Sequence, residues 1–162
     1  MSLGDWLRNG WLGAHKTGPK EIFDLLGLAD RDLRECQAGG LGPDWRLAIA
    51  YNSALQSATA ALAAAGYRAA RDGHHYRVIQ SLAFTIGAEV DLIAKLDAFR
   101  KKRNISDYEL SGSVSDQEAQ EMLAIATALR KVVGGWLKEN YPEFVSNVFP
   151  ARPRPSSRRG PR

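Results

Sequence analysis

The longest regular pattern in this sequence is a stripe of apolar residues that recurs every three or four positions between Ala119 and Leu137. Its members are Ala119, Met122, Leu123, Ala126, Leu129, Val133, Trp136 and Leu137. This spacing places apolar side chains on one face of an α-helix, which turns once in about 3.6 residues. Ser115 followed by Glu118 is a capping-box pattern that marks a helix start. The sequence therefore predicts a long last helix that begins after Ser115 and that Pro142 discourages from continuing.

Four earlier segments show the same helical spacing. They are a segment that starts at Lys20, then 43–66, 74–86 and 90–103. In the second segment the predicted inward-facing stripe is Trp45, Ala48, Ile49, Asn52, Leu55, Thr59 and Leu62. No stretch shows sustained two-residue alternation bounded by hairpin turns, so we expect no sheet. Because the connections between neighbouring helices are short, the pattern predicts an all-α fold, an antiparallel up-and-down bundle of about five helices.

Composition divides the chain into three parts. Residues 1–19 form a lead-in, 20–145 the bundle, and 146–162 a tail rich in Pro, Arg, Ser and Gly. The tail cannot bury enough apolar area to offset the entropy lost on ordering, so it is predicted to be disordered. Trp6, Leu7 and Trp11 in the lead-in can share one face of a short turn, which would dock on the bundle, on a partner or on a membrane surface. No segment resembles a membrane span or a secretory signal, and we expect a cytoplasmic protein.

The positive charge is concentrated in the tail. The chain has 22 basic and 18 acidic residues, and five arginines after position 150 account for the excess of +4. The rest of the chain is close to neutral, which excludes a surface that is basic throughout. The sequence also lacks a phosphate-binding glycine loop that ends in Lys-Ser/Thr, a His-Glu-x-x-His motif and a nucleophile-elbow serine. The common nucleotide-binding and hydrolase classes are therefore excluded.

Neither a metal nor another cofactor is expected. His74 and His75 are adjacent, and adjacent helical side chains point about 100 degrees apart, so the two rarely bind one ion. Acidic or thiol partners at helical spacing are also missing around them. We therefore expect His74 to begin a helix and His75 to make a surface contact.

The most informative segment runs from Arg100 to Glu109, at or beyond the end of the fourth predicted helix. One interpretation is structural, because cations near a helix C-terminus interact favourably with the macrodipole and Arg103 can pair with Asp107. The other interpretation is that Arg103 and Asn104 donate hydrogen bonds to a phosphate while Asp107 or Tyr108 orients a neighbouring group. The spacing alone leaves both open.

An Arg-Asn pair late in an all-α bundle resembles the HEPN superfamily of small helical ribonucleases and nucleotide-binding modules. The resemblance covers about residues 30–137 and extends to small bacterial members of the superfamily. Its hallmark is an Arg followed by Asn or another polar residue, with a His four to six positions after the Arg. Arg103 and Asn104 match this hallmark, and Tyr108 stands where the family has His. Tyr51 and Asn52, together with the sequence from His74 to Tyr76, add to the likeness.

The resemblance implies a metal-independent site that acts on RNA. On this basis we assign Arg103, Asn104, Asp107 and Tyr108 as candidate catalytic residues. Candidate substrate-binding residues are Arg100, Lys102, His74 and His75. Because a tyrosine of ordinary pKa is a poor base at neutral pH, the loss of the family His removes much of the expected acid-base contribution, and His74 or His75 is a conceivable replacement.

Three functional hypotheses remain open from the sequence. The first is a module that binds RNA through Arg103, Asn104 and the basic tail, either as a weak ribonuclease or without cutting. The second is a protein-interaction module, such as a toxin-antitoxin component or an accessory dimer to a nucleotidyltransferase, with a small protein partner. The third gives the helices a structural role and no ligand. A homodimer is expected because members of the family pair, and because Trp45, Tyr51 and Trp136 offer more aromatic surface than one core absorbs.

Overall fold

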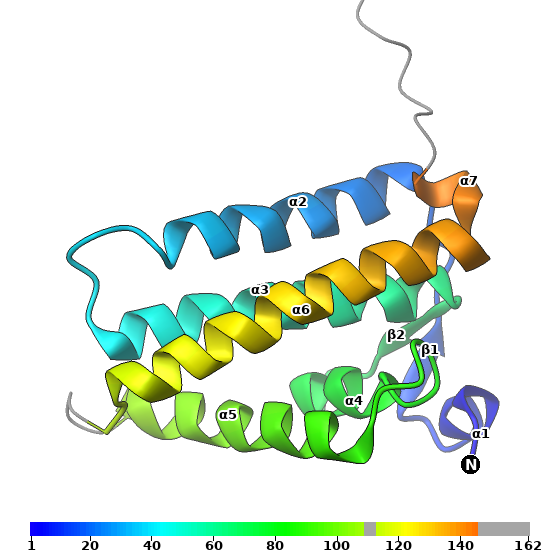
Figure 1. The fold of residues 1–162 in the computed structure, drawn as a ribbon. Coiled ribbons are helices and arrows are strands. Elements are labelled where there is room, and N and C mark those ends of the chain that lie inside the picture. The colour runs from blue at the N-terminus through cyan, green and yellow to red at the C-terminus, as the bar shows by residue number, and fades with distance from the viewer. Residues whose placement is uncertain (109–112, 146–162) are drawn as a thin grey trace, which may run out of the picture.

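The chain is mostly helical, as the sequence predicted. The computed structural model describes residues 1–108 and 113–145, without the side chains of 105–108, so the predicted tail at 146–162 lies outside the described residues. The described part contains seven helices and one pair of strands (Figure 1). In chain order they are α1 Leu3–Arg8, β1 Leu12–Ala14, α2 Pro19–Glu35, α3 Pro43–Ala64, β2 Tyr67–Ala69, α4 His74–Ser81, α5 Val90–Tyr108, α6 Asp116–Asn140 and α7 Pro142–Val145. In these residues every helix is too short or too polar to cross a lipid bilayer.

The expectation of no sheet is wrong at one place. β1 and β2 pair antiparallel, with Leu12 opposite Ala69 and Ala14 opposite Tyr67. Each strand has three residues, which is too short to show a two-residue alternation. The strands are also separated by α2 and α3, so no hairpin turn marks them in the sequence. The pairing ties the lead-in to the chain that follows α3.

The lead-in docks on its own chain, which is the first of the three alternatives for its tryptophans. α1 has a complete capping box between Ser2 and Asp5, which stabilises a helix of only six residues. Trp6 is buried in the core, and its ring meets Trp11 edge to face at 6.0 Å. The guanidinium carbon of Arg77 lies 3.8 Å from the Trp11 ring centroid, a cation–π contact that links the lead-in to α4.

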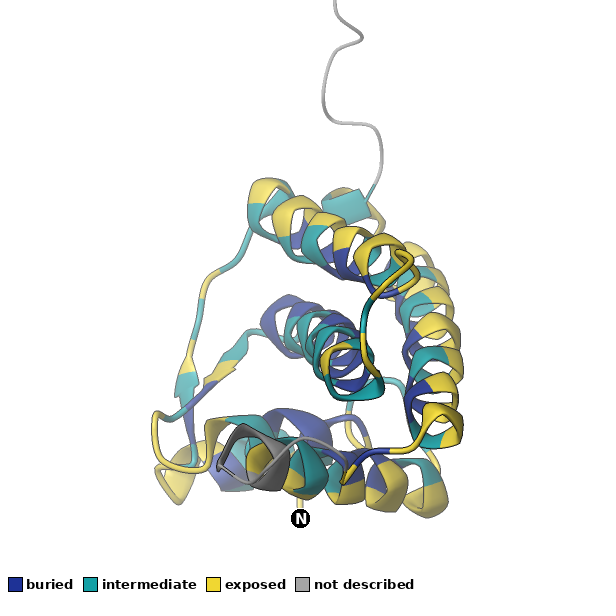
Figure 2. Ribbon diagram, turned by 90° about the vertical axis from the view of Figure 1, so that its left-hand side faces the viewer, coloured by how far each residue is buried: buried dark blue, intermediate teal, exposed yellow. Residues whose placement is uncertain are grey.

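The predicted inner stripe of the second helix is wrong for most of its length. Trp45 is 68% exposed, whereas Leu47 and Tyr51 are fully buried. α3 lies in the middle of the molecule and contacts α2, α4, α5 and α6 (Figure 2). Its alanines and serines are small enough for neighbours to approach from several sides, so a single apolar stripe is not required. Tyr51 therefore adds no surface for a dimer, and Trp136 packs on Tyr141 at 5.3 Å between ring centroids.

Two helix ends differ from the prediction. α4 ends at Ser81 instead of Ile86, and the Ser81 hydroxyl donates to the backbone oxygen of Val78 at 2.6 Å. α5 continues to Tyr108, so Arg103 and Asn104 lie inside a helix and more than one turn before its end. The interaction of a cation with the helix macrodipole is confined to the last turn, so it does not account for Arg103 and Asn104. The predicted Arg103–Asp107 ion pair lies outside the described side chains.

The last helix follows the sequence closely. α6 starts after Ser115 with the predicted capping box, and its buried residues are Ala119, Met122, Ala126, Leu129, Val133 and Leu137. The Ser115 hydroxyl accepts from the backbone nitrogen of Glu118 at 3.1 Å, and the Glu118 carboxylate accepts from the backbone nitrogen of Ser115 at the same distance.

Removal of this cap tests its contribution to stability. We expect Ser115→Ala to lower the free energy of unfolding by about 0.5–2 kcal/mol, because the backbone donor of Glu118 loses its partner. Urea unfolding followed by circular dichroism measures the change. Ser113→Ala, an exposed position in the loop before the helix, is the control and should change stability by less than about 0.5 kcal/mol. Equal losses in both variants would contradict a role for the cap.

Candidate functional site

Three helices bring the candidate residues together. Tyr51 lies in α3, His74 and His75 open α4, and Arg100 and Arg103 lie on α5. These helices contact one another (Figure 1). Gly73 precedes α4 with a φ of 65°, a left-handed conformation that glycine adopts without steric cost. This turn starts α4 at His74, so both histidines fall in its first turn.

Tyr51 is the shared platform of the site. Its hydroxyl oxygen lies 3.4 Å from Nδ1 of His75. The guanidinium carbon of Arg103 lies 5.3 Å from the centroid of the Tyr51 ring, within cation–π distance. A cation from α5 and an imidazole from α4 therefore contact the same phenol from α3.

The electrostatics keep Tyr51 and His75 uncharged near neutral pH. Burial raises the pKa of Tyr51 to about 12, although the positive charges of Arg103 and Arg100 act in the opposite direction. Burial lowers the pKa of His75 below its usual value near 6.5, and the charges of Arg103, His74 and Arg100 lower it further. An imidazole that is neutral at pH 7 can accept a proton, which is the requirement for a general base.

The contact between Tyr51 and His75 can form with either tautomer of the ring. With a proton on Nδ1, His75 donates to the phenol oxygen, and Nε2 keeps a lone pair. With a proton on Nε2, the phenol donates to Nδ1. In both cases the contact orients the imidazole relative to Arg103.

Arg100 lies one turn before Arg103 on α5. Its Nε donates to Asp97 at 2.8 Å, and its guanidinium carbon lies 5.6 Å from the Tyr76 ring centroid. Asp97 also pairs with Lys101 at 3.4 Å, so its single negative charge is shared between two cations. Among the described side chains of the site, Arg100, Lys101 and Arg103 outnumber the single carboxylate of Asp97, and such an excess of positive charge favours an anion.

The other predicted site residues are arranged differently. His74 is exposed, and its ring centroid lies 5.9 Å from that of His75. Asn104 is exposed on α5, while Lys102 forms an ion pair with Glu118 of α6. The backbone of Asp107 and Tyr108 belongs to α5, but both side chains lie outside the described residues.

Sequence reasoning did not assign Tyr51, Tyr76 or Asp97 to the site. Tyr51 was noted only for its likeness to a family and as an aromatic residue. Tyr76 directly follows the two histidines, and Asp97 lies one turn before Arg100, so their spacing was a usable signal. Tyr51 in α3 is separated from Arg103 in α5 by β2 and α4, and no local pattern indicates their contact.

A basic hollow adjoins His74. It has a volume of about 580 Å³, and its charged lining residues are Arg68, Arg71 and His74. Its other lining residues come from β1, β2 and the residue after β2. His74 therefore lies between the Tyr51–His75–Arg103 cluster and two further cations, Arg68 of β2 and Arg71 on the loop before α4.

Comparison with protein-family models finds no match for this chain, and comparison with curated protein sequences finds none. Within the part of the chain that the structure describes, no three His, Cys, Asp or Glu side chains are grouped so that they could hold a metal ion.

Proposed function

We propose that this chain is an HEPN-like module that binds RNA and cleaves it weakly without a metal ion. The fold expected for such a module is the antiparallel up-and-down bundle. The observation that carries the proposal is the meeting of His75 and Arg103 on Tyr51. The sequence has no His after Arg103, where the family has one. His75 offers an imidazole beside the same arginine, from another helix.

Arg103 supplies the phosphate-binding group in this proposal. Its guanidinium presents several N–H donors in a fixed plane, which suits a phosphate better than a lysine does. Arg100 and the exposed Asn104 lie within one turn of it on α5 and can donate to the same backbone. Arg68 and Arg71, which line the neighbouring hollow, extend the positive surface for a longer strand.

His75 supplies the proton acceptor. With Nδ1 donating to Tyr51, Nε2 takes the proton of a ribose 2′-hydroxyl, and the 2′-oxygen attacks the adjacent phosphorus. The new bond joins the 2′-oxygen to phosphorus, and the bond from phosphorus to the 5′-oxygen breaks. The leaving oxygen takes a proton from water, and the hydroxide that remains takes the proton from Nε2 of His75, which restores the neutral imidazole. The products are a 2′,3′-cyclic phosphate and a 5′-hydroxyl end. Donors from Arg103 stabilise the charge that develops on the phosphate oxygens.

A homodimer is part of the proposal. Of the three aromatic residues that motivated it, Trp45 alone is strongly exposed, and it lies in the first turn of α3. A large exposed indole is a common feature of protein interfaces.

The experiment that tests RNA binding compares Arg103→Ala with wild type. We expect the variant to bind a fluorescent single-stranded RNA about tenfold more weakly or worse, because a charge-assisted phosphate contact contributes on the order of 1.5–3 kcal/mol. Fluorescence anisotropy at several salt concentrations measures the affinity. The slope of log affinity against log salt should also fall by about one phosphate contact.

Lys20→Ala is the matched control for this experiment. Lys20 is an exposed cation at the start of α2 and pairs with Asp24 at 2.7 Å. The substitution therefore removes one positive charge, as Arg103→Ala does, but at a position outside the site. Its affinity should stay close to that of wild type. Equal losses for Arg103→Ala and Lys20→Ala would mean that binding depends on net charge alone, and the site assignment would be wrong.

A further inference from the structure

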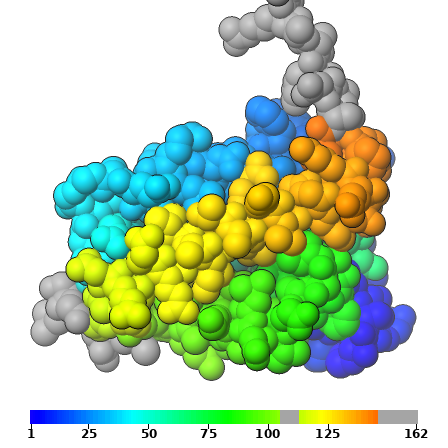
Figure 3. All heavy atoms as spheres, viewed as in Figure 1, coloured from blue at the N-terminus to red at the C-terminus, as the bar shows by residue number. Residues whose placement is uncertain are grey.

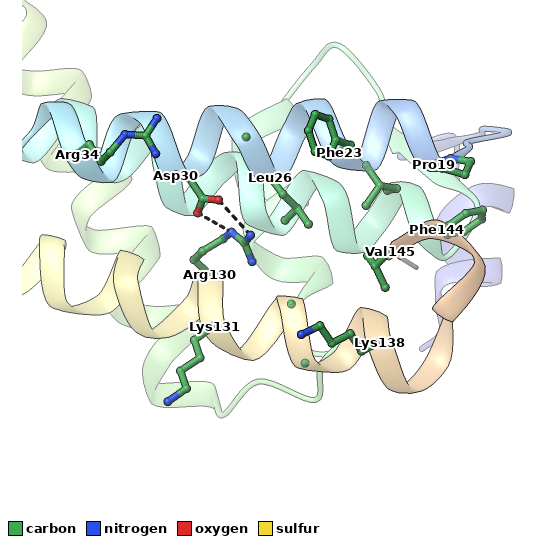
Figure 4. Close-up of a pocket in the computed structure, with 14 residues that line it drawn as sticks. Pro19, Phe23, Leu26, Asp30, Arg34, Arg130, Lys131, Lys138, Phe144 and Val145 are labelled. Atoms are coloured by element: carbon green, nitrogen blue, oxygen red, sulfur yellow. Dashed lines mark hydrogen bonds and ion pairs between the residues drawn. The ribbon is translucent and has the colours of Figure 1, made fainter. Parts of the chain in front are cut away.

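A groove separates α2 from the second half of α6 and ends against α7. α2 and α6 border each other on the face shown in Figure 3, and Figure 4 shows the groove between them. Its volume is about 570 Å³. Ile22 and Leu26 of α2 are buried at its floor, and Phe144 and Val145 of α7 line one end. No residue of the Tyr51–His75–Arg103 cluster lines it.

The walls of the groove lack side chains at three helical positions. Gly27 on α2 and Gly134 and Gly135 on α6 all line it. A Cβ atom at Gly27 or Gly135 would meet no atom within 4 Å, so the space beside both backbones is open. Glycine in a helix interior is less stable than alanine. The two adjacent glycines therefore weaken α6 at the positions where its backbone lines the groove.

The rim of the groove is positive. Asp30 is the only acidic residue among its lining residues, and Arg130 of α6 binds it through two hydrogen bonds of 2.8 and 3.2 Å (Figure 4). The other lining cations are Arg34, Lys131 and Lys138. No carboxylate of the described residues lies within ion-pair distance of these three. Figure 4 shows the Lys131 side chain pointing away from α2, so its ammonium group does not face the groove.

We propose that this groove binds an acidic amphipathic helix of another protein. The lining residues of α2 run from Pro19 to Arg34, which at a rise of 1.5 Å per residue is about 22 Å, or four turns of helix. A helix of this length places apolar residues at three- and four-residue spacing on the floor. Its flanking Asp and Glu side chains then face Arg34 and Lys138. The glycines allow the two backbones to approach closely.

Other occupants fit the groove less well. The sequence 151–162 contains five arginines and no acid, so its charge has the same sign as the rim. A second copy that packs groove to groove would bring the same cations together. RNA matches the rim but has no apolar ridge for Ile22 and Leu26. Charge and hydrophobicity together favour an acidic helix.

The test uses the full chain and a designed peptide as the probe. The peptide has about 15 residues, with Leu at helical spacing on one face and Glu beside it, and carries a fluorescein label. We expect saturable binding by fluorescence anisotropy. A peptide with the same Leu residues but Lys in place of every Glu should bind at least about tenfold more weakly.

Two variants locate the binding to the groove. Gly135→Leu fills the open space and should weaken the acidic peptide about tenfold or more, whereas Ala94→Leu on the exposed face of α5 should not change it. Lys138→Glu should weaken binding most at low salt, whereas Lys95→Glu on α5 should have little effect. Circular dichroism checks that each variant is folded, and the surface substitution Lys138→Glu remains a test if Gly135→Leu does not fold.

Several outcomes would overturn the proposal. They are no binding of the acidic peptide at about millimolar concentration, equal binding of the Lys peptide, or no effect of Gly135→Leu and Lys138→Glu. Weaker RNA binding by Lys138→Glu with unchanged peptide binding would assign the rim to RNA. A larger particle in light scattering that Gly135→Leu abolishes would assign the groove to a second copy. The test is independent of the RNA site, because Arg103→Ala should leave peptide affinity unchanged.

Discussion

Replacement of His75 by alanine is expected to slow metal-independent RNA cleavage by about 100- to 10,000-fold, the usual contribution of a general acid or base. His75 is the half-buried imidazole that shares Tyr51 with Arg103. Its removal takes away the proton acceptor but leaves the arginine that holds phosphate. RNA affinity should therefore change much less than the cleavage rate.

The measurement is a time course of cleavage of a labelled RNA in the presence of EDTA. His15→Ala is the control, because His15 is also partly buried but pairs with Glu21 at 2.7 Å, far from the cluster in sequence. It should cleave at the wild-type rate. Cleavage by His75→Ala at the wild-type rate would remove His75 from the mechanism, and loss of activity in EDTA would contradict a metal-independent reaction.

The pH profile gives a second test of the same residue. The pKa of His75 lies below its usual value, so the neutral imidazole already predominates at neutral pH. A group that must be unprotonated to act loses activity as pH falls through its pKa. We therefore expect the rate to fall below a midpoint that is more acidic than about 6.5 and to be flat just above it. A midpoint above 7 would mean that another group limits the reaction.

Replacement of Leu47 by alanine is expected to lower the free energy of unfolding by about 2–5 kcal/mol, because its side chain is fully buried. Trp45, two residues earlier in α3, is 68% exposed. Trp45→Ala should cost less than about 0.5 kcal/mol at a surface position, although it removes a larger side chain. Residue size and the predicted stripe both suggest a larger loss of stability for Trp45→Ala, whereas the observed burial predicts a larger loss for Leu47→Ala.

Urea unfolding of both variants measures these changes. Unfolding at several protein concentrations, together with light scattering, also tests the proposed homodimer. If Trp45 lies in an interface, Trp45→Ala should lower the association constant and leave the stability of the dissociated chain unchanged. A larger loss of chain stability for Trp45→Ala than for Leu47→Ala would contradict the burial described here.

The positions of the long helices were predictable because their signals are local. Pro43 fits the first turn of α3, and the capping box at Ser115 starts α6. Along α6 one helix face is buried and the other exposed, so the apolar stripe coincides with the core. β1 and β2 were missed because strands of three residues have no periodicity to detect. The buried face of α3 was missed because small residues line it on several sides.

The candidate site was predictable in part. Arg103 and Asn104 were assigned as candidates from their adjacency and from the resemblance to a family, and the structure places Arg103 beside Tyr51. The choice between His74 and His75 required the structure, since their side chains leave α4 in different directions and only His75 is described in contact with Tyr51. Tyr51 had no sequence signal for this role, because an isolated tyrosine in a helix is most often a packing residue.

The sequence by itself determined the helical character of this protein, the approximate positions of its main helices and the location of its cationic residues along the chain. Capping, proline placement and apolar spacing act within one or two turns, so they can be recognised in the sequence without the tertiary structure. Only the tertiary structure decided that α3 is central, that Trp45 is exposed, and that His75, Tyr51 and Arg103 meet. Such contacts join residues far apart in sequence, and they depend on how several helices share their buried surfaces.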